Sequence, residues 1–167
     1  MTSPYPMWDE WLADLSPGER TRALELSERF AGLGAEDAED WARSELAEDL
    51  PQLARFLLLR QVWEQAINGF DRPGAIDAVP AAARLLDSGA DRADLITLAR
   101  RAALDAAFAV LYALDVPNLD VDDDSLPGWS VHETSGDGGR PGRHMDGLHE
   151  DLLIMDPSGR QAEDLLF

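Results

Sequence analysis

The chain contains no Cys and no Lys, so all 14 of its basic residues are Arg. Without Cys, a disulfide framework, a thiolate metal site and a Cys nucleophile are excluded. Ala, Gly and Pro are abundant together with Arg, as codon usage in a GC-rich genome would produce by itself. We therefore attach no function to the absence of Lys.

Long apolar segments are also missing. The longest run covers residues 106–114, which is far short of the roughly 20 residues that a membrane-spanning helix needs. The first ten residues carry no positive charge and no apolar stretch, unlike a secretory signal. We therefore expect a cytoplasmic protein without a membrane partner.

Positive charge is scarce. The chain has 14 Arg and 33 Asp and Glu, which gives a formal net charge of -19. Such a field repels nucleic-acid phosphates and speeds the encounter with basic partners. The imbalance lies in residues 1–50 and 116–167, whereas residues 51–115 hold 8 acids and 7 Arg. We expect a basic protein partner and no nucleic acid.

A length of 167 residues suits one domain that buries roughly 70% of its unfolded surface. Helix signals divide its first 115 residues. Ser16-Pro17-Gly18-Glu19 combines a Ser cap, an early Pro and a capping-box Glu, and predicts a helix that Gly32 and Gly34 end. Further helices are expected from about residue 35 and at about 51–68, 75–88 and 91–115, with Pro80 marking a kink or a late start.

The fold class is therefore mainly α, with about five helices around two apolar central ones at about 51–68 and 91–115. Alternation over 129–134, a Gly-rich turn and residues 143–145 predict a small hairpin. Helical spacing favours a short helix over a strand at 148–155. We expect a helical core at 1–115, with the acidic loop, hairpin and tail of 116–167 packed on it in a single domain.

The acidic residues supply the first candidate site. Asp120, Asp122 and Asp124 resemble the opening of a calcium loop, but Ser125 and Val131 stand where that loop needs Gly and Glu. A partner-binding surface is the preferred interpretation, with Trp129 as an apolar anchor. Its predicted carboxylates are Asp120, Asp122, Asp123, Asp124, Glu36, Asp37 and Asp40.

Two other groups of residues attract attention. All three His residues fall within 132–149, and His132, His144, His149 and Glu150 form an alternative metal or acid-base site. Asp105 interrupts the most apolar helix, so a buried ion pair with Arg60 or Arg101 is expected for structural reasons.

No Walker sequence, nucleophile elbow or paired zinc ligands occur, so no catalytic residue and no cofactor is assigned. The leading hypothesis is an acidic, non-enzymatic protein-binding domain, such as an inhibitor or immunity-type protein that covers a basic partner. The alternatives are a metal-dependent enzyme or accessory protein that uses the His cluster, and a scaffold or oligomer subunit.

Overall fold

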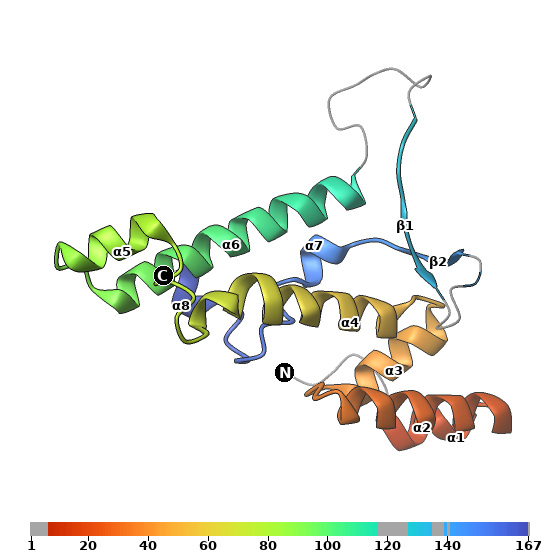
Figure 1. Cartoon of the computed structure of the whole chain (residues 1–167). Helices are drawn as coiled ribbons and strands as arrows, with labels where there is room; N and C mark the ends of the chain where they lie inside the picture. The colour runs from red at the N-terminus through yellow and green to blue at the C-terminus, as the bar shows by residue number, and fades with distance from the viewer. Residues whose placement is uncertain (1–6, 117–126, 135–138, 140, 167) are drawn as a thin grey trace. The chain divides into compact units, whose positions relative to one another are not determined.

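The computed structural model describes residues 7–116, 127–134, 139 and 141–166 (Figure 1). The chain is mainly helical, with one small antiparallel hairpin, which confirms the predicted fold class. In chain order the elements are α1 (Trp8–Asp14), α2 (Pro17–Gly32), α3 (Ala38–Ala47), α4 (Gln52–Val62), η1 (Trp63–Ile67), η2 (Asn68–Asp71), α5 (Pro80–Asp87), α6 (Arg92–Asp115), β1 (Val131–Thr134), β2 (Pro141–Met145), α7 (Leu148–Asp151) and α8 (Glu163–Leu166).

The chain divides into two compact units. The N-terminal unit contains Met1–Ala54 and Glu133–His144, and the C-terminal unit contains Arg55–His132 and Met145–Phe167. Residues after 116 therefore contribute to both units. A single domain over the whole chain stays a prediction.

In the N-terminal unit, α2 begins and ends as its sequence predicts. The Glu19 amide donates to Ser16 Oγ at 3.4 Å, and the Ser16 amide donates to Glu19 Oε2 at 3.0 Å. Hydrogen bonds from the Ser16 hydroxyl and amide lower the pKa of Glu19, because they favour its ionised form. At the other end, Gly34 adopts a φ of +88°, and the next amide, that of Ala35, donates to the Phe30 carbonyl at 3.0 Å.

The core of this unit lies between α2 and α3. Ala23, Leu26 and Phe30 recur at spacings of three and four along α2 and are buried. Phe30 stacks on Trp41 of α3 with 5.9 Å between ring centroids. The apolar residues of the two helices thus form the contact between them.

One arginine attaches the hairpin to α3 within the same unit. Arg143 of β2 donates to Glu133 Oε1 at 2.6 Å, to Glu45 Oε1 at 2.8 Å and to the Leu50 carbonyl at 2.9 Å. The hydrogen bond with Glu133 raises the pKa of Arg143 and lowers that of Glu133. Glu45 is buried, so Arg143 supplies the cation that its carboxylate needs.

In the C-terminal unit, α6 is the longest helix and contacts η1, η2, α7 and α8. Asp91 caps it, accepting hydrogen bonds from the amides of Ala93 at 2.7 Å and Asp94 at 3.3 Å. The helix expected at 51–68 is instead α4 followed by a π-helical turn, η1. Trp63 and Ile67 of η1 are fully buried, and their turn contacts α6.

The tail residues 145–155 enter the core of this unit. Met145, Leu148, Leu152 and Met155 are all buried, as their helical spacing predicts, although the helix itself covers only Leu148–Asp151. The indole N–H of Trp63 donates to the Leu152 carbonyl at 2.7 Å. Arg55 pairs with Asp151 at 2.5 Å, but burial still raises the pKa of that carboxyl above its usual value.

Two sequence expectations need correction or completion. Pro80 marks a late start, because α5 begins at this residue, where its missing N–H costs nothing.

Asp105 pairs with Arg101 at 3.0 Å, but the pair lies at the surface, with 59% of the Asp105 side chain exposed. Arg60 pairs instead with Glu64 at 2.7 Å. The expected burial was wrong because the face of α6 that carries Asp105 is not covered.

Candidate functional site

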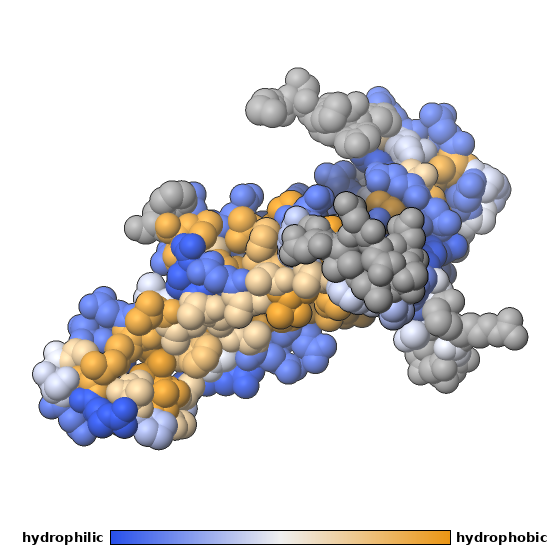
Figure 2. Space-filling model, turned by 90° about the horizontal axis from the view of Figure 1, so that it is seen from above, coloured by the Kyte–Doolittle hydropathy of each residue, from blue (hydrophilic) through white to orange (hydrophobic). Residues whose placement is uncertain are grey.

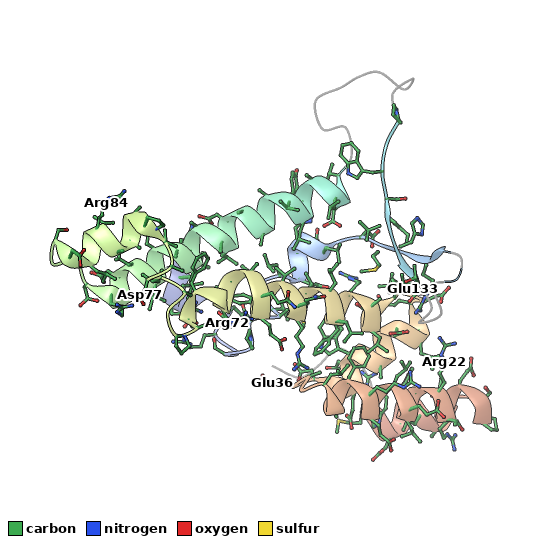
Figure 3. All side chains as sticks on the ribbon, in the orientation of Figure 1. Arg22, Glu36, Arg72, Asp77, Arg84 and Glu133 are labelled. Carbon is green, nitrogen blue, oxygen red and sulfur yellow. The ribbon has the colours of Figure 1, made fainter. Side chains whose placement is uncertain are left out.

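A cluster of carboxylates occupies the start of α3 in the N-terminal unit. Glu36, Asp37, Glu39 and Asp40, which we call the α3 acidic cluster, are all exposed. Figure 3 shows Glu36 at one end of the α2 and α3 pair. The positive end of the helix dipole favours carboxylates at this position, which explains why the helix tolerates four of them.

Most of this charge is not neutralised. Asp40 lies 3.5 Å from Arg43, one turn later. Glu36, Asp37 and Glu39 form no ion pair with any residue that the structure describes. Asp37 is the N-cap residue, yet its side chain makes no capping hydrogen bond. Three adjacent carboxylates therefore keep their oxygens available to a partner.

Arg43 lies against two aromatic rings of α1. Its guanidinium lies 5.8 Å from the ring centroid of Trp8 and 5.5 Å from that of Trp11. These cation–π contacts explain the burial of Arg43 and give α1 a specific contact with α3. The two N-terminal Trp residues thus stabilise their own unit.

Other arginines are also committed to ion pairs. Eight Arg of the described residues form such pairs. Arg100 is an example: it binds Asp164 of α8 at 3.0 Å and the Asn68 side chain at 3.0 Å. Its role is to hold the C-terminal helix and η2 against α6.

The second part of the predicted partner surface is described only at Trp129. Asp120, Asp122, Asp123 and Asp124 lie outside the described residues. Trp129 is 49% exposed, and its indole N–H donates to the Ala113 carbonyl at 2.7 Å. That carbonyl is in the last turn of α6, where the helix offers no donor of its own. Trp129 therefore presents its ring to solvent from a fixed position in the C-terminal unit.

The histidines of the alternative site have separate environments. His132 lies exposed on β1, with its ring 3.0 Å from the Ser130 hydroxyl. His144 is exposed on β2 in the N-terminal unit, and Glu150 is exposed on α7 in the C-terminal unit. Within the ranges that the structure describes, no three His, Asp or Glu side chains are arranged to hold a metal ion. The metal-dependent alternative stays a prediction.

His149 has a partner that the sequence did not indicate. Its amide donates to Asp115 Oδ2 at 3.0 Å, and its ring Nδ1 lies 2.6 Å from the same oxygen. The rings of Phe108 and Tyr112 meet the imidazole nearly at right angles, at centroid distances of 5.5 Å and 4.9 Å. This environment fixes the orientation of the His149 ring.

The Asp115 and His149 pair has a structural role, because it connects the end of α6 to α7. The Asp115 side chain is only 4% exposed, so its charge needs a nearby donor. A carboxylate also orients the imidazole in hydrolase triads, but the His149 ring has no further hydrogen bond within the described part of the chain. We assign it the role of fastening α7 to the end of α6. The signal in the sequence was an acid at the C-terminal end of a helix, where the dipole disfavours it.

No protein-family model, no curated protein and no solved structure matches the chain. Among the described residues, no helix has both the length and the apolar character required to cross a membrane.

Proposed function

We propose that the protein is a non-enzymatic protein-binding domain that engages a basic protein partner through the α3 acidic cluster. The observation that supports this function is the group of exposed carboxylates on Glu36, Asp37 and Glu39, which pair with no cation among the described residues. Neighbouring like charges produce a negative potential that attracts and orients a basic surface. An inhibitor or immunity-type protein that covers phosphate-binding residues is the concrete form of the proposal.

Two further features belong to this proposal. Trp129 offers an exposed ring on a fixed backbone, and interface hot spots are enriched in Trp. Asp120, Asp122, Asp123 and Asp124 contribute on the basis of their charge. The carboxylates would set the rate of encounter, and the indole would slow dissociation.

The test begins with partners captured from a lysate of the native host. The captured protein is purified, and its association rate constant is measured between about 0.05 M and about 0.5 M salt, a range over which the screening length falls severalfold. We expect a basic protein whose association slows by about tenfold or more over this range. Captured proteins that are acidic, or that associate at a salt-independent rate, would contradict the proposal.

Matched variants locate the site. Glu36→Gln, Asp37→Asn and Glu39→Gln together should slow association at low salt and remove most of its salt dependence. Asp87→Asn, Asp94→Asn and Glu163→Gln change the net charge equally at exposed positions in the C-terminal unit, and should leave association nearly unchanged. Equal effects of the two triple variants would assign the attraction to net charge rather than to the α3 acidic cluster.

A further inference from the structure

One face of α6 is apolar and exposed. Leu104 and Leu111 are buried on the opposite face of the helix. In contrast, Leu98 is 66% exposed and Val110 is 60% exposed. Six apolar exposed positions lie within about 120° of one another around the helix axis. They are Leu98, Ala102, Ala106, Ala109, Val110 and Ala113.

The exposed apolar residues form a continuous face along the helix and are not isolated surface leucines. Figure 2 shows apolar surface gathered along α5 and α6, where Leu85 of α5 is exposed as well. The 24 residues of α6 correspond to a length of about 36 Å. An ordinary surface helix has charged and polar residues on its solvent side, so the uncovered face of α6 is suited to an interface.

Charge indicates what covers it. In a chain with a net charge of -19, α6 carries three Arg and three Asp and so has no net charge. Two copies of the protein repel each other through their net charge, and the neutral α6 adds least to that repulsion. A basic protein finds no net negative charge here to attract it. The occupant that fits is a second copy of this chain.

The direction of the second copy follows from an ion pair at the border of the face. Asp105 is exposed and lies one turn from the half-buried Arg101, with 3.0 Å between Nε and Oδ2, and Arg101 also donates to the Leu165 carbonyl at 3.1 Å. In an antiparallel, end-to-end pair of α6 helices, Arg101 lies level with Ala106 of the second copy and so within one residue of its Asp105 along the axis. A parallel pair brings Arg101 against Arg101. Opposed helix dipoles favour the antiparallel pair further.

We infer that α6 is the interface of a two-fold symmetric homodimer in which the two copies of this helix pack antiparallel. The interface is isologous, because the same apolar face serves both copies. The dimer does not depend on the proposed basic partner. It uses the α6 face of the C-terminal unit, whereas the proposed partner binding uses the α3 acidic cluster of the N-terminal unit.

Sedimentation equilibrium over a wide concentration range, at about 0.15 M salt to limit charge repulsion, tests the dimer. The unmodified protein should show a monomer and dimer equilibrium. Val110→Glu should raise the dissociation constant at least tenfold, or about 1.4 kcal/mol. Leu24→Glu, at an exposed leucine of α2, should leave the constant unchanged. A monomer up to about 1 mM, or equal effects of both variants, would overturn the inference.

The absence of Cys makes the direction of packing measurable. End-to-end antiparallel packing puts Leu98 opposite Ala109, while the two copies of residue 98 lie about 16 Å apart along the axis. A bis-maleimide with a reach of about 8–10 Å, the separation of packed helices, should cross-link a mixture of the Leu98→Cys and Ala109→Cys proteins. Either protein alone should not cross-link. Cross-links in either single protein, or none in the mixture, would contradict the antiparallel dimer.

Discussion

Trp63 and Trp129 provide a test of how burial changes the contribution of one hydrogen bond to the free energy of unfolding. Each indole N–H donates to a backbone carbonyl at 2.7 Å, that of Leu152 for Trp63 and that of Ala113 for Trp129. Trp63 is completely buried, whereas Trp129 is 49% exposed. Replacing each with Phe removes the same donor from two different environments.

The expected losses of unfolding free energy differ severalfold. In Trp63→Phe, the Leu152 carbonyl loses its donor inside the core, at a cost of about 1–3 kcal/mol. The smaller ring leaves a cavity of about 40 Å³, which adds about 1 kcal/mol. The total is about 2–4 kcal/mol. In Trp129→Phe, water replaces the donor, so the loss should stay below about 1 kcal/mol.

Urea unfolding followed by far-ultraviolet circular dichroism measures both variants without relying on Trp fluorescence. The difference in unfolding free energy between the two variants should exceed about 1 kcal/mol. Similar losses in both variants would refute the reasoning, because they would mean that the Leu152 carbonyl is as accessible to water as that of Ala113.

Three further predictions concern buried charges. Burial would raise the pKa of Asp156, but hydrogen bonds from the amides of Ser158 and Ala162 and from the Ser158 hydroxyl lower it below its usual value. Its contribution to stability is therefore present above about pH 4 and is lost as the pH falls further. Asp156→Asn should lower stability by about 1–3 kcal/mol at pH 7 and by less near pH 3, measured by thermal unfolding; a loss that is constant with pH would contradict this. Arg143→Gln should cost about 2–3 kcal/mol in urea unfolding, because it deprives the buried Glu45 carboxylate of its cation, and a neutral effect would mean that Glu45 does not depend on this pair. His149→Ala should cost about 2–3 kcal/mol because Asp115 loses its partner, whereas His144→Ala, at an exposed position, should change stability by less than about 0.5 kcal/mol; the opposite order would exclude the anchoring role of His149.

The starts and ends of helices were predictable because their signals are local. Ser16 and Glu19 are three residues apart, and Asp91 caps the two amides that follow it directly. Such contacts depend on backbone geometry over one turn, and the chain forms them wherever the residue types occur in order. The same holds for Gly34, whose positive φ ends α2.

Contacts between distant residues were not predictable in this way. The Trp63 indole reaches a carbonyl 89 positions later, and Asp115 meets a histidine 34 positions later. The apolar composition of α6 predicted a central helix, but burial depends on which faces other elements cover. The core covers the face with Leu104 and Leu111 and leaves Leu98 exposed.

The candidate site was predictable in part for the same reason. A run of acids at the start of α3 follows from the helix dipole, so Glu36, Asp37 and Asp40 were identified from the sequence. Among the described residues, Asp40 has an arginine partner, Arg43, and Glu36 and Asp37 have none. The position of Arg43 beside Trp8 and Trp11 decides which carboxylate it meets. Sequence spacing alone does not contain that information.

The central claim is that the α3 acidic cluster attracts a basic protein. The most direct measurement is the association rate constant of the purified partner at low salt with the Glu36→Gln, Asp37→Asn and Glu39→Gln variant, beside the Asp87→Asn, Asp94→Asn and Glu163→Gln control. The account predicts association at least about tenfold slower for the first variant and nearly unchanged for the second. Equal rates for both would contradict it.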